Sequence, residues 1–226
     1  MSGLRAALVD LDGTLVDSAA ELAAAVDRVR TDLGYEPAGP SKVRDWVGEG
    51  IERLVARALA DATGAEPDAV ALRDARARFD TAYAEVLGTM SPLYPGVVEG
   101  LDRLRGAGIA TACITNKSRI FALSLLGALG ILDRFDVVVA GDSAAAKKPD
   151  AAPLVLAAEK LGVGPAACVM IGDSAIDVAA ARAAGCPAWC VRTGYNRGEP
   201  VDAADPDAVF DAFDELVRAL LDAEPA

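Results

Sequence analysis

The sequence predicts an α/β protein with a Rossmann-like parallel sheet, helices on both faces, and an inserted all-helical segment. Five short apolar runs without polar alternation indicate strands that are buried on both faces. They are Ala6–Val9, Ile109–Ile114, Val137–Ala140, Ala167–Ile171 and Ala188–Val191. Helical patterns separate the last four runs, and such alternation forms right-handed crossovers around a parallel sheet. Residues 18–88 contain no strand-like run, which predicts the helical insertion.

The insertion contains three amphipathic helical patterns, in Leu22–Leu33, Ile51–Leu59 and Pro67–Leu87. Glycines and prolines between residues 34 and 40 separate the first pattern from the second. The segment Ser91–Val97 is typical of a linker that returns the chain to the sheet. The expected division is a core and a helical domain, formed by residues 1–17 with 90–226 and by residues 18–89.

The second half of the chain supplies the remaining predicted helices. Leucines and alanines at spacings of three and four indicate helices after the second and third runs, and a further helical pattern follows the fourth run. Glycines act as stop signals for the three patterns, at Gly130, Gly162 and Gly185. From Gly198 the chain is rich in Asp and Ala, and a last helix is expected near Ala212–Leu221.

Composition and charge limit the partners. The 226 residues are 53% hydrophobic and 25% charged, as in folded globular proteins. A net charge of −12 argues against nucleic acid and anionic membranes as partners, and an anionic substrate would need local cations. We find no signal peptide and no apolar run long enough to cross a bilayer. The sequence leaves the choice between monomer and dimer open.

Cysteine and histidine usage narrows the chemistry. Four cysteines lie in apolar surroundings without a Cys-x-x-Cys pair, and the chain has no histidine. We therefore expect buried thiols in a reducing compartment, which indicates the cytoplasm, and no zinc site. Catalysis by Ser-His or Cys-His pairs is excluded, so a general acid or base must be a carboxylate, Lys, Tyr or Cys.

Two carboxylates follow the first apolar run. Asp10 and Asp12 share one side of an extended strand. Ligands of parallel α/β sheets bind beyond the carboxyl ends of the strands, which makes this pair a candidate catalytic site. Asp and Gly also favour turns, so the Asp-x-Asp-Gly-Thr sequence by itself is compatible with an ordinary strand-ending turn.

Polar residues follow three further runs. Thr115 and Asn116 precede a predicted helix, where they either hold an anion or cap the helix. Lys148 precedes a proline, which favours an extended backbone; the alternative is a solvated lysine. Asp173 and Asp177 lie one helical turn apart and either act at the site or compensate the helix N-terminus.

The combined pattern is more specific than any single motif. Strands that end in carboxylates, a hydroxyl, a lysine and carboxylates would bring three or four carboxylates and one lysine together. Close carboxylates repel one another unless a cation lies among them, and an open site of oxygen ligands favours Mg²⁺. The cation and the lysine would then attract a phosphate group.

Four segments, "DLDGTLVDS", "ITNK", "KKPD" and "GDSAIDVAAA", resemble in order and spacing the four signature motifs of the haloacid dehalogenase superfamily. The helical insertion resembles that superfamily's cap of the first type, and the similarity covers essentially the whole chain. Three further segments resemble bacterial phosphoglycolate phosphatases: "VRDWVGEG" (Val43–Gly50), "LYPGVVEGL" (Leu93–Leu101) and "GYNRGEP" (Gly194–Pro200).

The resemblance implies a Mg²⁺-dependent phosphomonoester hydrolase that acts through an aspartyl-phosphate. It implies that Asp10 is the nucleophile and that Asp12 is the general acid and base. Thr115, the Asn116 backbone and Lys148 would hold the phosphoryl oxygens.

The implied metal site has four contributors: Asp10, the carbonyl of Asp12, Asp173 and, behind them, Asp177. Two features depart from the family pattern. Ala175 and Ile176 stand where relatives usually carry a polar residue, and Ala151 replaces a common proline. Neither removes an assigned chemical group, although the first is expected to loosen the support around Asp173.

The resemblance also implies a substrate, the small phosphorylated metabolite 2-phosphoglycolate. The cap segment expected to read the leaving group contains the candidates Arg44, Gly48, Glu49 and Gly50. Arg44 either meets a substrate carboxylate or is a surface charge, and Trp46 is expected in the core. The alternatives are a phosphatase for a phosphosugar or phosphosugar acid, and a β-phosphoglucomutase-like or pyrophosphatase-like enzyme. Asp12 argues against a dehalogenase, and the complete catalytic set argues against a protein that only binds.

Overall fold

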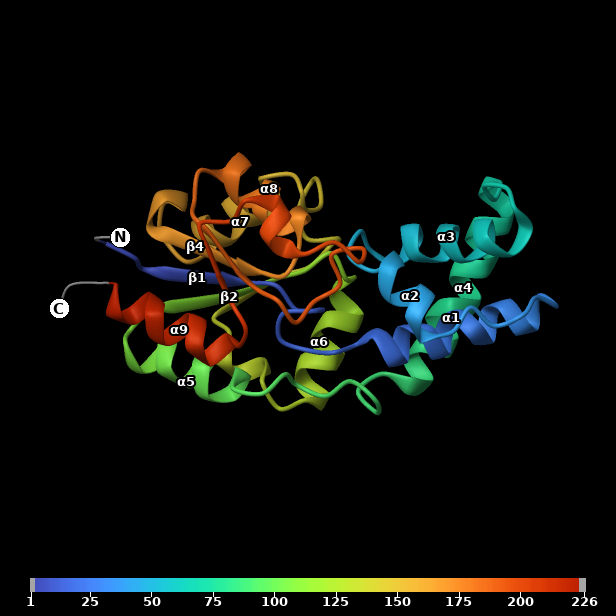
Figure 1. Cartoon of the computed structure of the whole chain (residues 1–226), viewed down its shortest axis with the longest axis horizontal. Coiled ribbons are helices and arrows are strands. Elements are labelled where there is room, and N and C mark those ends of the chain that lie inside the picture. Colours follow the sequence, from blue (N-terminus) through green and yellow to red (C-terminus); the bar gives the residue numbers. More distant parts are fainter. Residues whose placement is uncertain (1–2, 224–226) are drawn as a thin grey trace.

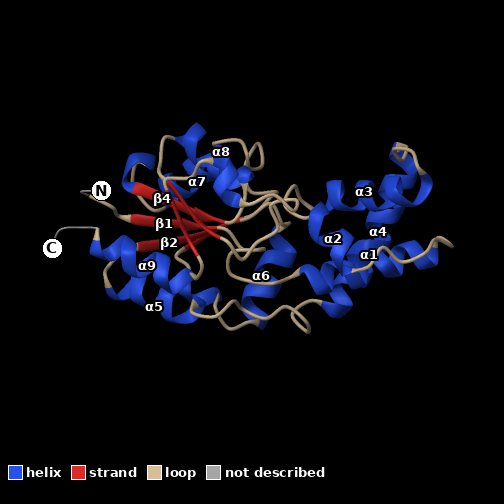
Figure 2. Ribbon diagram, in the orientation of Figure 1, coloured by secondary structure: helices blue, strands red, loops and turns tan. Residues whose placement is uncertain are grey.

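A six-stranded parallel sheet forms the centre of the larger part of the molecule (Figures 1 and 2). The computed structural model describes residues 3–223. The strand order is β3-β2-β1-β4-β5-β6, with every neighbouring pair parallel. The strands are β1 (Ala6–Val9), β2 (Ala110–Ile114), β3 (Val137–Val139), β4 (Cys168–Gly172), β5 (Ala188–Val191) and β6 (Ala208–Phe210).

Helices cover both faces of the sheet. One face packs against α5 (Val97–Gly106), α6 (Arg119–Ala128) and α9 (Phe213–Asp222). The other packs against α7 (Ala152–Lys160) and α8 (Ala175–Ala184). Alternate residues of β1 enter the two apolar cores, so this strand is buried on both sides, as its unbroken apolar run predicts.

Four further helices form a separate group at one end of the molecule, away from the two termini (Figure 1). They are α1 (Ala19–Asp32), α2 (Pro40–Trp46), α3 (Ile51–Thr63) and α4 (Ala69–Val86). Their apolar faces share a core of their own, which Phe79 and Tyr83 of α4 join. Phe121 of α6 also enters this core and stacks edge-on against Tyr83, so the two parts of the molecule are in contact.

Two chain segments connect the helical group to the sheet and lie against each other. Val16 forms an isolated antiparallel bridge with Leu93, and the Tyr94 amide donates to the Leu15 carbonyl. Three short 3₁₀ helices complete the described elements: Leu132–Arg134, Pro165–Ala167 and Val201–Ala204.

The predicted α/β fold, the five strands and the final helix are confirmed to within one or two residues at their ends. Strand β6 and helices α2 and α5 were missed. Strand β6 has only three residues in the Asp- and Ala-rich tail, α2 starts at a proline, and α5 directly follows the predicted linker. Trp46 packs against the core of the helical group, as expected. The four cysteines are buried and free, also as expected. The division into residues 1–17 with 90–226 and 18–89 remains a prediction.

Candidate active site

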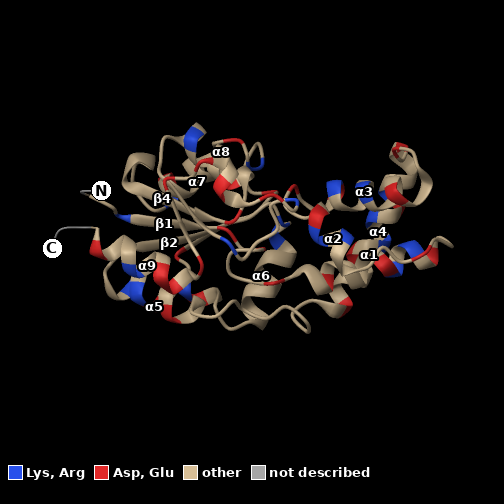
Figure 3. Cartoon of the chain, in the orientation of Figure 1, with Lys and Arg blue, Asp and Glu red and all other residues tan. Residues whose placement is uncertain are grey.

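The polar residues predicted after the strands meet at one edge of the sheet, where its loops face the helical group. Asp10 and Asp12 follow β1, Thr115 follows β2 and Asp173 follows β4, because parallel neighbours end at the same edge. Lys148 reaches this edge from the loop between β3 and α7. Acidic and basic residues both gather in this region (Figure 3).

Lys148 joins two of these carboxylates. Its Nζ lies 2.7 Å from Asp10 Oδ1 and 2.7 Å from Asp177 Oδ1, and it donates to the Ile114 carbonyl at 2.8 Å. These contacts use all three protons of the ammonium group. The side chain is buried, so its position is fixed by the surrounding atoms.

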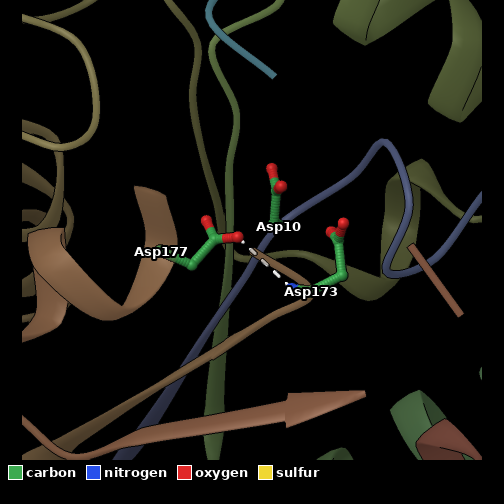
Figure 4. Close-up of side chains that lie close together, drawn as sticks. All are labelled: Asp10, Asp173 and Asp177. Atoms are coloured by element: carbon green, nitrogen blue, oxygen red, sulfur yellow. Dashed lines mark hydrogen bonds between the residues drawn. The ribbon is translucent and has the colours of Figure 1, made fainter. Parts of the chain in front are cut away.

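Asp173 and Asp177 are held by several donors. Asp173 accepts hydrogen bonds from the Thr14 hydroxyl at 2.8 Å and the Tyr195 amide at 3.0 Å. Asp177 accepts from Ser174 in a capping box at the start of α8, and from the Asp173 amide. Figure 4 shows Asp10, Asp173 and Asp177 close together. The support of Asp173 therefore comes from Thr14 and the Tyr195 backbone.

This carboxylate cluster fits a divalent cation. One oxygen from each of Asp10, Asp173 and Asp177 lies within 4.8 Å of the others. Burial is the largest cause that raises the pKa of Asp10 well above its usual value, and burial with nearby Asp177 raises the pKa of Asp173 to about 7. Buried, mutually close carboxylates become easier to ionise when a cation binds among them, and an all-oxygen donor set suits Mg²⁺. The loops leave room for the cluster only because glycines stand at 13 and 194, where a Cβ atom would overlap Asp173.

Asp12 lies beside a lysine that the sequence analysis did not select. Lys117 Nζ is 2.9 Å from Asp12 Oδ1 and donates to the Tyr83 hydroxyl at 2.9 Å. The Ser18 hydroxyl also donates to Asp12, at 2.5 Å. Burial lowers the pKa of Lys117, but the charge of Asp12 and the contact with Tyr83 outweigh burial and leave this pKa above its ordinary value. The lysine is therefore charged at neutral pH.

Thr115 and Asn116 follow β2 as predicted, and their contacts are now visible. The Thr115 hydroxyl accepts from the Lys117 amide at 3.1 Å. The Asn116 side chain donates to the carbonyls of Gly48 and Lys148, both at 2.9 Å, and accepts from the Lys148 amide. Asn116 thus ties the edge of the sheet to the loop between α2 and α3 in the helical group.

A small chamber of about 40 Å³ lies between this edge and the helical group. The sheet contributes the polar wall, formed by Asp10, Asp12, Thr115, Asn116, Lys117 and Lys148. The helical group contributes an apolar wall and two glycines: Leu22, Val47, Gly48, Gly50, Ile51 and Leu54. The chamber therefore combines charged groups with an apolar ceiling, as expected for a site that holds a small polar ligand.

A larger cavity of about 460 Å³ opens beside the chamber and also contains Asp10, Asp12 and Lys148. Glu49 lines it together with Arg53 and Arg197. Glu49 forms ion pairs with Arg57, Arg53 and Arg197, and we refer to these four residues as the Glu49 cluster. Arg197 comes from the loop after β5, so the cluster also joins the two parts of the molecule.

The structure does not bring Arg44 to either cavity. Its guanidinium lies over the Tyr195 ring at 4.8 Å and donates to the Thr193 carbonyl at 3.2 Å. Gly48, Glu49 and Gly50, the other three residues predicted on this segment, do line the cavities. Arg44 instead holds α2 against the loop after β5.

Three contacts of the candidate site were not predicted from the sequence. Lys117 stands inside the "ITNK" segment, two residues after Thr115, and this position was the only available signal. Tyr83 lies one helical turn after Phe79 and has the pattern of an ordinary core residue. Ser18 directly follows the "LVD" turn and resembles a helix cap, but it donates to Asp12.

The fold and this arrangement of carboxylates and lysine define a class of hydrolases. Residues 4–185 match the family model of the haloacid dehalogenase-like hydrolases, and the chain belongs to this family.

Individual relatives are similar over nearly their whole length. The phosphoglycolate phosphatase of Nitrosococcus oceani is 44% identical over 213 residues, covering 94% of this chain and 95% of the relative. That of Nitrosospira multiformis is 41% identical over 217 residues, covering 96% of each. The crystal structure of a predicted phosphoglycolate phosphatase from Haemophilus somnus 129PT superposes with a TM-score of 0.92 at 32% identity, covering 97% of this chain and 99% of that one.

Proposed function

We propose that this protein is a Mg²⁺-dependent phosphatase that converts 2-phosphoglycolate to glycolate and phosphate. The observation that carries the proposal is the chamber in which Asp10 and Asp12 lie with Thr115, Asn116 and Lys148. Phosphoryl transfer through a covalent intermediate needs a nucleophile, an acid and base, and donors for the phosphoryl oxygens. The relatives named phosphoglycolate phosphatase support the choice of substrate.

In the proposed reaction, Asp10 attacks phosphorus and becomes an aspartyl-phosphate, while Asp12 donates a proton to the leaving oxygen of glycolate. Water then attacks the phosphorus and loses its proton to Asp12, which releases phosphate and restores Asp10. Both carboxylates line the same chamber, and the lysine beside Asp12 and the Ser18 hydroxyl hold its side chain in place.

The phosphoryl oxygens need positive or donating partners. Lys148 is already 2.7 Å from Asp10 and therefore stands where charge accumulates during transfer. The Thr115 hydroxyl and the Asn116 backbone supply further donors at the same edge of the sheet. Asp177 fixes Lys148 from the opposite side, at 2.7 Å.

Mg²⁺ is the proposed cofactor. Asp10, the carbonyl of Asp12 and Asp173 would hold it, and Asp177 would support them. When bound, the cation would offset the charge of the carboxylates and of the substrate phosphate. The crowding of three buried or half-buried carboxylates within 4.8 Å supports this assignment.

The helical domain, residues 18–89, is proposed to act as a cap that closes over the substrate. Leu22, Ile51 and Leu54 belong to its apolar wall of the chamber, and closure would exclude water from the reacting phosphate. None of the helices in residues 3–223 has the length and apolarity that a membrane crossing requires. We propose a cytoplasmic location, which the buried free cysteines support.

The test is kcat/KM for a substrate panel with and without Mg²⁺. The panel contains 2-phosphoglycolate, β-glucose 1-phosphate, pyrophosphate, a sugar 6-phosphate and p-nitrophenyl phosphate. We expect 2-phosphoglycolate to lead by about 100-fold, or roughly 2.7 kcal/mol of transition-state discrimination. A flat panel would contradict the substrate, and the absence of any Mg²⁺-dependent hydrolysis would contradict the phosphatase itself.

A further inference from the structure

Lys117 has a hydrogen-bonding capacity that its contacts do not use up. An ammonium group has three donors, and in the described residues Lys117 Nζ contacts two acceptors, Asp12 Oδ1 and the Tyr83 hydroxyl. The other buried lysine, Lys148, contacts three. Lys117 nevertheless lines the chamber, so one donor remains for a ligand there.

The position of Lys117 relative to the acid and base fixes which ligand group it can reach. Asp12 must contact the leaving oxygen to protonate it, and Lys117 is 2.9 Å from Asp12 Oδ1. Lys117 Nζ therefore lies within roughly 6 Å of the leaving oxygen, since each contact is about 3 Å long. In 2-phosphoglycolate one methylene group separates this oxygen from the carboxylate, which brings the carboxylate within reach of Lys117.

We propose that Lys117 is the residue that selects a phosphorylated α-hydroxy acid, by pairing with the substrate carboxylate next to the leaving oxygen. The inference rests on the proposed phosphatase function and extends it to a residue that determines specificity. Asp12 holds the ammonium group from the sheet and Tyr83 of α4 holds it from the helical group, so both parts of the molecule orient this lysine.

The alternative cations are less suited to this task. Arg53 and Arg197 line the larger cavity, but their side chains are 64% and 53% exposed and both pair with Glu49. The Lys117 side chain is 3% exposed. A charge that is shielded from water binds a carboxylate more strongly than one in free exchange with solvent.

The experiment compares 2-phosphoglycolate with its neutral amide, which has nearly the same size and shape. For the wild type we expect kcat/KM for the acid to exceed that for the amide by about 100-fold, the usual scale for a desolvated charge pair. In Lys117→Met this preference should fall to within a few-fold, mainly through a higher KM for the acid. Arg53→Gln and Arg197→Gln are the matched controls and should keep the preference.

Each other outcome overturns the proposal. If the acid and the amide lose activity equally in Lys117→Met, the lysine serves only to hold Asp12. If the preference disappears in Arg53→Gln or Arg197→Gln instead, the Glu49 cluster binds the carboxylate. If the wild type shows no preference while it hydrolyses both, the phosphatase assignment stands and this inference fails.

Loss of folding in one variant does not remove the test. Circular dichroism checks each variant, and Lys117→Gln, which retains a polar donor without the charge, replaces Lys117→Met if that variant is unfolded. The wild-type comparison of acid and amide needs no variant and contradicts the proposal if the two are equal.

Discussion

The two sides of the proposed active site hold their charges in different ways. On the side of the sheet, Lys148 and Lys117 are buried and each contacts at least two partners at fixed positions. In the Glu49 cluster, where the helical group meets the loop after β5, Arg53 and Arg197 are more than half exposed and share one carboxylate, Glu49. The comparison indicates that the groups proposed to react are rigidly placed, whereas the Glu49 cluster can exchange partners with little free-energy cost.

The largest expected loss of activity comes from a change on the side of the sheet, where the charged groups are rigidly held. Asp10→Asn keeps the shape of the side chain but removes the nucleophile, so kcat for p-nitrophenyl phosphate should fall by at least about 10⁴-fold. Thermal unfolding should still be cooperative, because an amide can accept a hydrogen bond from Lys148. Asp45→Asn, a carboxylate outside both active-site cavities, is the matched control and should retain activity. Substantial Mg²⁺-dependent turnover by Asp10→Asn would rule out Asp10 as the nucleophile.

A second prediction concerns how the stability of the folded chain depends on pH when Mg²⁺ is removed from the carboxylates at the sheet edge. The pKa values of Asp10 and Asp173 are raised in the folded chain, that of Asp173 to about 7, chiefly by burial. Between the ordinary carboxylate pKa and these values the folded state binds more protons than the unfolded state, so the free energy of unfolding falls as pH rises. We expect Tm in EDTA to be several degrees lower at about pH 8 than at about pH 5.

Calorimetry with and without Mg²⁺ checks whether Tm falls as pH rises. Bound Mg²⁺ favours the ionised carboxylates and should make the fall in Tm smaller. Asp173→Asn should make the fall in Tm smaller in EDTA as well. A Tm in EDTA that rises between these two pH values in the wild type, relative to Asp173→Asn, would contradict the assignment.

Features that depend on local sequence could be predicted, whereas contacts between distant segments could not. The strands and the residues that follow them were predictable, because an apolar run buried on both faces and the polar residue at its end are local patterns, as at Asp10 and Thr115. The pairing of Lys117 with Asp12 was not, because it depends on how the loop after β2 approaches the loop after β1. The same holds for Tyr83, whose hydroxyl reaches the site only through the packing of α4 against α6.

The contacts of Arg44 show what could not be predicted from the sequence in the helical group. Its position in a segment expected to face the site suggested a substrate contact, and the chemistry of a guanidinium fits a carboxylate. The side chain packs over Tyr195 and binds a backbone carbonyl, and its contact with a substrate stays a prediction. Sequence spacing places a residue on a segment but does not choose among the partners within reach of a long side chain.

The smallest effect is expected in the Glu49 cluster. Arg197→Gln removes one of three cations around Glu49, and Arg57 and Arg53 remain to pair with it. Because exposed ion pairs contribute little, the free energy of unfolding should change by less than about 1 kcal/mol and kcat/KM for 2-phosphoglycolate by less than about 3-fold. Any change should shrink further in about 0.5 M NaCl, where exposed charges are screened.

A loss above about 10-fold in kcat/KM would place the Glu49 cluster in contact with the substrate. Carboxylate recognition would then move from the buried chamber to the larger cavity, and the contrast between a rigid and an exchangeable side would no longer hold.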